Sequence, residues 1–298
     1  MSLEFSILAL ILTGFVIRRL RIVGSEGEKN ITDLVLLVIL PCNIFSSFMT
    51  KLSGEMLSDC LWVLGISVGI QIVSLIYGRF FFRASPDEKR RNLVYAMIVS
   101  NAGFLGNPIA EGIYGAPGLM LASIYLIPMR IMMWSEGLAI YSGNADRRAA
   151  VKHVLTHPCV VACFLGGAVM LSGVEVPELI LLPIQTLAKC NTAMSMLVIG
   201  MILARIDFRH LVDRTVAAFT LHRLVLFPLL VYGVCRLLPV SRIAMGVSVI
   251  LAAMPAAATT TMLALKYDQA PEFATKLVIF STLCSIPGIM IWNAILNV

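Results

Sequence analysis

The stretch SNAGFLGNPIAEGIYG, residues 100–115, interrupts one of the most apolar parts of the chain with residues that oppose a continuous helix. Glycine and proline are the weakest helix formers, and asparagine favours turns and helix ends. The residues concerned are Asn101, Gly103, Gly106, Asn107 and Pro108. Apolar, helix-like sequence lies on both sides, so the pattern predicts a helix that is broken in its middle.

The composition indicates where this break lies. The chain has 298 residues, of which 59% are hydrophobic and only 13% charged, and its mean hydropathy is +0.90. Soluble domains carry about a quarter charged residues, and a soluble protein of this length could not hide so much apolar surface in one core. We therefore expect an all-α integral membrane protein that lies in the lipid bilayer.

Ten apolar segments are long enough to cross a bilayer, which takes about 20 helical residues. They are residues 3–17, 31–49, 58–82, 92–114, 117–142, 156–173, 177–203, 214–238, 243–266 and 273–297. The first segment opens with Glu4 and is followed by Arg18, Arg19 and Arg21. That charge order differs from a cleaved signal peptide, so the segment is interpreted as a transmembrane helix.

Lysine and arginine gather in every second loop, which predicts the orientation in the membrane. The cations of these loops are Arg18, Arg19, Arg21, Lys29, Arg83, Lys89, Arg90, Arg91, Arg147, Arg148, Lys152, Arg205, Arg209 and Lys266. The intervening loops contain little beyond Lys51 and Arg242. Because basic loops stay in the cytoplasm, both termini are expected outside a plasma membrane. Topology thus accounts for the net charge of +6 without nucleic acid as a partner.

Short similarities between the two halves indicate an internal repeat. Pro41-Cys42-Asn43 matches Lys189-Cys190-Asn191, and Pro108 matches Pro255. The two pairs are separated by nearly the same number of residues along the chain. We expect two five-helix repeats, residues 1–142 and 156–298, joined by a cytoplasmic linker at 143–155. An odd number of crossings per repeat makes the halves inverted, and paired broken segments in inverted halves indicate a transporter's binding site.

The opening stretch and its counterpart AAMPAAATTTMLA, residues 252–264, supply the candidate substrate site. At a helix break in the membrane, backbone groups and helix dipoles can face a polar solute, and amide and hydroxyl side chains add donors and acceptors. The candidate substrate-binding residues are Asn43, Asn101, Gly103, Gly106, Asn107, Pro108, Lys189, Asn191, Pro255, Thr259 and Thr260. The alternative is that proline and glycine only kink these helices.

Ionisable residues inside membrane segments are costly and are functional candidates by default. Lys189 could attract an anion or pair with a carboxylate. Arg130 and Glu136 are candidates for coupling-ion binding, and a separation of six positions places them on different helix faces. Arg223 is interpreted as a structural residue that extends to the cytoplasmic edge, and Glu111 as an exposed or vestibular carboxylate near the outer face.

Other classes of protein lack support in the sequence. An enzyme would need a nucleophile, an acid–base pair or a metal cluster, and the chain contains no HExxH or GxSxG motif. Its cysteines and histidines show no spacing typical of a metal site, so we expect neither metal nor cofactor. A channel is the remaining alternative, because broken helices also occur in channels.

The motifs LPCNIF, SNAGFLGNPI with IYG, and AAMPAAATTTMLALKYD followed by STLCSIPGIMIW resemble the auxin efflux carrier family, over essentially the whole chain. That family includes bacterial organic-acid permeases and plant auxin exporters. The resemblance implies a fold like that of the bile acid/sodium symporters, with broken fourth and ninth helices that cross at mid-membrane. Segments 1, 2, 6 and 7 would form a scaffold, and segments 3–5 and 8–10 a mobile, elevator-like transport domain.

By the same resemblance, Asn101 matches the asparagine that meets the substrate carboxylate, and the family's pairing implies a homodimer through segments 2 and 7. The chain lacks the long central loop of the plant members, and Asn107 and the triple threonine also differ. We therefore expect a secondary transporter of a small organic anion, a carboxylate that is either auxin-like or a dicarboxylate. The alternatives are a cation-coupled symporter of bile-acid-like amphipathic substrates or a channel of the same architecture.

Overall fold

The computed structural model describes residues 2–49, 54–142, 152, 155–204 and 212–296, and all of its regular elements in those ranges are helices. In chain order they are α1 (Ser2–Arg19), α2 (Ser25–Leu34), η1 (Val35–Ile39), α3 (Leu40–Ser47), α4 (Gly54–Phe81), α5 (Asp87–Ile98), η2 (Ala102–Gly106), α6 (Asn107–Trp134), α7 (Glu136–Ser142), α9 (Pro158–Ser172), α10 (Glu178–Ala188), α11 (Asn191–Leu203), α12 (Arg214–Leu221), η3 (His222–Leu226), α13 (Phe227–Leu237), α14 (Arg242–Ala252), α15 (Thr259–Lys266) and α16 (Pro271–Leu296). The η elements are wider π-helical turns within longer helices. Most of the predicted linker, with Arg147 and Arg148, lies outside the described residues, as do Arg205 and Arg209.

Six helical runs in the described chain are long and apolar enough to cross a membrane. They are residues 25–47, 54–81, 102–142, 178–203, 214–237 and 271–296, with shorter apolar helices at 158–172 and 242–252. Backbone breaks explain part of the difference from the ten predicted segments; in addition, α1 carries three charged residues and α9 spans only 15 residues. The predicted segments 92–114 and 243–266 are each divided into two helical pieces, and Gly115, with a φ of 67°, interrupts α6 where the predicted fourth and fifth segments meet.

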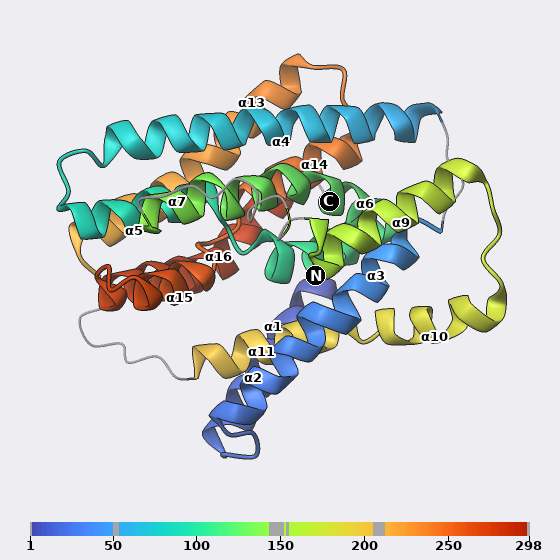
Figure 1. The fold of residues 1–298 in the computed structure, drawn as a ribbon, viewed down its shortest axis with the longest axis horizontal. Helices are drawn as coiled ribbons and strands as arrows, with labels where there is room; N and C mark the ends of the chain where they lie inside the picture. The colour runs from blue at the N-terminus through green and yellow to red at the C-terminus, as the bar shows by residue number, and fades with distance from the viewer. Residues whose placement is uncertain (1, 50–53, 143–151, 153–154, 205–211, 297–298) are drawn as a thin grey trace.

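The helices form two groups, of which the first lies towards the lower right of Figure 1 and the second towards its upper left. The first group contains α1, α2–η1–α3, α9, α10 and α11, and α1 packs along α11. Glycine makes this contact close, because a Cβ on Gly200 would collide with the carbonyl oxygen of Ile11, and one on Gly14 with that of Leu197. Small residues allow membrane helices to approach at the level of the backbone.

The second group contains α4–α7 and α12–α16, and α6 packs against both α4 and α14. The two groups meet where α6 and η2 contact α3, α9 and α11. The buried apolar core continues through both groups. The long helix α6 therefore contacts both groups: α4 and α14 of the second group, and α3, α9 and α11 of the first.

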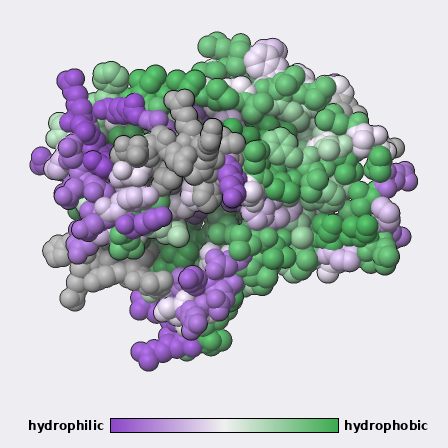
Figure 2. All heavy atoms as spheres, in the orientation of Figure 1, coloured by the Kyte–Doolittle hydropathy of each residue, from purple (hydrophilic) through white to green (hydrophobic). Residues whose placement is uncertain are grey.

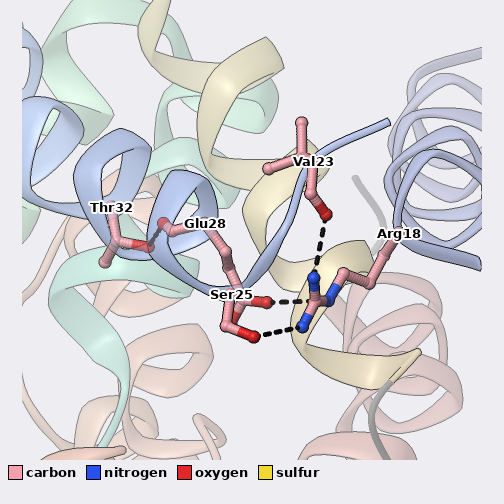
Figure 3. A network of polar contacts seen from close by, with 5 residues as sticks. All are labelled: Arg18, Val23, Ser25, Glu28 and Thr32. Atoms are coloured by element: carbon pink, nitrogen blue, oxygen red, sulfur yellow. Dashed lines mark hydrogen bonds and ion pairs between the residues drawn. The ribbon is translucent and has the colours of Figure 1, made fainter. Parts of the chain in front are cut away.

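The turn between α1 and α2 is held by a buried charge pair (Figure 3). Arg18 Nε lies 3.3 Å from Glu28 Oε2, and the Arg18 Nη atoms donate to Val23 O and Ser25 Oγ at 2.8 Å and 3.0 Å. These contacts hold the first turn of α2, whose helical run begins at Ser25, before the predicted start at residue 31. The first turns of α2 are polar, so a hydropathy pattern does not include them.

The outer surface is apolar over much of its extent. Figure 2 shows hydrophilic residues gathered on the left of the molecule and along its lower edge, with hydrophobic residues over most of the remainder. Large exposed apolar side chains include Leu12, Leu61, Ile72, Phe80, Leu179 and Leu237. Soluble monomers rarely expose such large apolar areas. The chain is thus an all-helical protein with the surface and helix lengths of an integral membrane protein.

Candidate functional site

The two broken helices meet through their non-helical backbone. Here, the crossover means residues 99–101, which follow α5, together with residues 253–258, which follow α14. The Asn101 amide donates to the Pro255 carbonyl at 2.8 Å, and the Ala257 amide donates to the Val99 carbonyl at 3.3 Å. Ser100 and Ala256 lie opposite each other in an antiparallel pairing. At a simple kink, the backbone amides would still bond to carbonyls of their own helix. Here they bond to the other helix, so both predicted interruptions are breaks.

Pairing across the crossover consumes part of the backbone that the sequence predicted to be free. The Ala256 amide donates to Ser281 Oγ of α16 at 3.1 Å, and Pro255 has no N–H to donate. Gly106 packs against α14, since a Cβ there would lie 2.5 Å from Leu251 Cδ2. The predicted residues Asn107, Pro108 and Pro255 are buried around this contact, whereas the Asn101 side chain is half-exposed.

Arg223 ties the two broken helices together. Its Nε donates to Met254 O and its Nη1 to Met97 O, both at 3.0 Å, and the residue is only 4% exposed. Met97 O is available because its usual helical partner, the Asn101 amide, bonds to Pro255 instead. A cation at two helix C-terminal ends is also favoured by the helix dipoles. These contacts agree with a structural role for Arg223, but the expectation that its side chain extends to the membrane edge is wrong.

A second polar cluster joins the two groups of helices. Asn43 Nδ2 of α3 donates to Glu111 Oε2 of α6 at 2.7 Å, and Asn191 of α11 lies near the same carboxylate. Asn191 is fully buried, and its Nδ2 has no hydrogen-bond partner in the described chain. The two asparagines that the sequence related by repeat therefore converge, and they do so on Glu111.

A third group lies beside the start of the first broken helix. A Cβ placed on Gly103 would lie 3.8 Å from Arg130 Nη2. Arg130 is 6% exposed, and its Nη1 has no partner among the described atoms. Asn107, one helical turn after Gly103, is fully buried, and neither atom of its amide has a described partner.

Of the remaining predicted residues, Lys189 and Glu136 lie away from these clusters, whereas Thr259 and Thr260 directly follow the crossover, and the Thr260 amide donates to Ala257 O at 3.0 Å. Lys189 is exposed in the turn between α10 and α11. Glu136 pairs with Arg79 at a partly exposed position, separate from Arg130. Thr259 Oγ1 accepts from Tyr95 OH at 3.1 Å, and Thr260 is buried with an Oγ1 that lacks a described partner. Within the described ranges, no three His, Cys, Asp or Glu side chains are grouped as a metal site requires.

Sequence reasoning missed the two carbonyl partners of Arg223 and gave Glu111 too little weight. Arg223 lies near the middle of the predicted segment 214–238, a depth that favours burial over extension to the edge. Glu111 follows Asn107 by one helical turn, so it continues the polar face of the broken helix. Both signals are present in the sequence, but the partners of these side chains come from distant segments.

The structure is an all-helical membrane protein in which two buried, broken helices are hydrogen-bonded to each other. Many secondary transporters are built around broken helices of this kind. Comparison with known proteins agrees with this class. A family model described as "Membrane transport protein" matches residues 3–153 and 147–293. The chain belongs to this family, the auxin efflux carrier family that its motifs resemble.

Two similar proteins align over nearly their full lengths. An "Uncharacterized transporter" of Methanothermobacter thermautotrophicus is 28% identical over 98% of this chain and 96% of its own length. An uncharacterized transporter of Methanocaldococcus jannaschii is 22% identical over 99% of this chain and 98% of its own length. The protein is thus a multi-pass membrane transporter by family, and transport, not catalysis, is the activity of that family.

Proposed function

We propose that this protein is a secondary transporter that carries a small organic anion across the cell membrane by alternating access. The observation that carries the proposal is the crossover, where the Asn101 amide bonds to the Pro255 carbonyl across two broken helices at 2.8 Å. Crossed breaks of this kind place helix ends and unwound backbone beside a solute near the membrane midplane.

The proposal includes the architecture expected from the sequence: ten crossings in two inverted halves, with both termini outside. The convergence of Asn43 and Asn191 on Glu111 and the pairing of the two breaks support a relation between the halves. In this proposal, the group with α1, α3 and α9–α11 is the scaffold, and the group with α4–α7 and α12–α16 moves. Exposed apolar residues on η1 and α10, such as Leu37 and Leu179, suit a homodimer through these helices.

An anion is favoured over a cation-coupled amphipathic solute by the charge at the crossover. Cation-coupled carriers bind their ion with unwound carbonyls and helix C-terminal ends. Here, the carbonyls of Met97 and Met254 already accept from Arg223. The guanidinium is a permanent cation, so the crossover carries its positive charge without sodium.

The test is transport by purified protein in proteoliposomes. A thermal-unfolding screen against organic acids first identifies ligands, because a ligand that binds the folded state raises its stability. The radiolabelled form of each hit is then used for uptake. We expect saturable uptake and counterflow, in which unlabelled acid inside the vesicle accelerates entry of labelled acid, in sodium and in choline buffer alike. Uptake that is linear in concentration and lacks counterflow would instead indicate a channel.

A further inference from the structure

Arg130 is a buried cation for which the described chain provides no counter-ion. The residue is 6% exposed, and Nη1 has no hydrogen-bond partner among the described residues. None of the ion pairs in the described ranges involves Arg130; these pairs are Arg18–Glu28, Arg79–Glu136 and Arg90–Asp87.

The surroundings of Arg130 are apolar or neutral. It lies on α6, which contacts α9, and it is close enough to His157, Cys159 and Cys163 to influence them electrostatically. Gly103 of η2 is also near. A Cβ placed on Gly103 would lie 3.8 Å from Arg130 Nη2. Leu126 Cδ1 is equally near to that position. No described carboxylate is among these contacts.

A buried charge without a partner costs several kcal/mol in a protein interior. Ionisable side chains inside membrane segments are costly for the same reason and are therefore rare. A fold keeps such a charge at low cost only if something neutralises it for part of the time. We propose that the Arg130 guanidinium, beside Gly103 at the first helix break, is an anion-binding subsite that receives the carboxylate of the transported solute. This inference rests on the proposed function, because it identifies where the anion of that function binds.

The chemistry of the side chains around Arg130 favours a carboxylate. A guanidinium presents parallel N–H donors that match the two oxygens of a carboxylate. Gly103 places no side chain in front of that fork. Asn107 lies one turn further along the same helix, a rise of about 5 Å, and both atoms of its buried amide lack described partners. A solute held at Arg130 therefore has a further donor and acceptor beside it.

The central test places a carboxylate on the protein itself. Gly103→Asp adds an acidic group within reach of Arg130, and the space around the Cβ position is free of close contacts. Gly103→Asn is the matched control, because it has the same shape without the charge. We expect Gly103→Asp to unfold at least about 2 °C above Gly103→Asn in the absence of solute, and to lose the response to added carboxylates.

The second test removes the cation from the purified full-length protein. Acetate, benzoate, succinate and indole-3-acetate are each compared with the corresponding neutral amide by thermal unfolding. We expect the wild type to be stabilised by one or more of the acids and by none of the amides. Arg130→Met should weaken the binding of those acids by about 30-fold or more, whereas Arg236→Met, at an exposed position of α13, should leave it unchanged.

The outcomes separate this inference from the proposed function. Wild-type affinity in Arg130→Met, or equal stability of the Gly103→Asp and Gly103→Asn proteins, would overturn the subsite. If Arg130→Met does not fold, the comparison at Gly103 still decides. If no acid stabilises the wild type or shows counterflow, yet Gly103→Asp is more stable than Gly103→Asn, the anion subsite stands and the proposed carboxylate transport is wrong.

Discussion

Replacement of Arg223 by methionine tests the connection between the two broken helices. Methionine keeps an unbranched side chain of similar length but donates no hydrogen bond. The change leaves Met97 O and Met254 O, which now accept at 3.0 Å each, buried without their donor. An unsatisfied buried acceptor costs about 1–3 kcal/mol, so two predict a loss of about 2–6 kcal/mol in the free energy of unfolding. At about 2 °C per kcal/mol for a chain of this size, the unfolding midpoint should fall by about 4–12 °C.

The assay is thermal unfolding of the purified protein in detergent, followed by intrinsic fluorescence. Arg236→Met is the matched control, because it removes an exposed arginine from the same helical run. Arg223→Lys should show an intermediate loss, since one ammonium group replaces a fork that spans two carbonyls. A midpoint for Arg223→Met equal to that of Arg236→Met would refute the reasoning, because the two hydrogen bonds would then contribute nothing to the fold.

Three further predictions concern transport and topology. Lys189→Ala should leave anion affinity unchanged in a binding assay, because Lys189 is exposed between α10 and α11; a marked loss would return it to the site. Pro255→Ala should lower the rate of counterflow more than it lowers the unfolding midpoint, because an added N–H lets the backbone change its pairing at the break; the reverse order would give Pro255 a structural role. Reporter fusions should place both termini outside and a tag in residues 143–151 inside, and a cytoplasmic C-terminus together with an outside N-terminus would mean that the number of crossings is odd.

The sequence located the breaks because their cause is local. Glycine and proline oppose helix wherever they occur, so residues 100–115 and 252–264 could be singled out without knowledge of the fold. The similarity of Asn43 and Asn191 in their surrounding residues was enough to relate two positions that meet at Glu111. The break itself starts at Val99, before the first glycine, because the backbone there pairs with the second broken helix.

The roles of the charged residues could not be obtained in this way. Arg130, Lys189 and Arg223 each lie inside an apolar segment, and their sequence surroundings do not distinguish them. The structure places Arg223 on two backbone carbonyls, Arg130 beside Gly103 and Lys189 at the surface. The difference depends on the direction of each side chain and on neighbours from other segments, and neither is contained in local composition or periodicity.

The most direct test of organic-anion transport at the crossover is counterflow of one identified acid by wild-type and Asn101→Ala protein, reconstituted at equal amounts. Hydrogen bonds to charged groups contribute about 1.5–3 kcal/mol, so loss of the Asn101 amide should raise the half-saturating concentration by about 10- to 150-fold. Saturable counterflow in the wild type with this shift in the variant is the predicted result. The same half-saturating concentration in both proteins would contradict a substrate contact at the crossover.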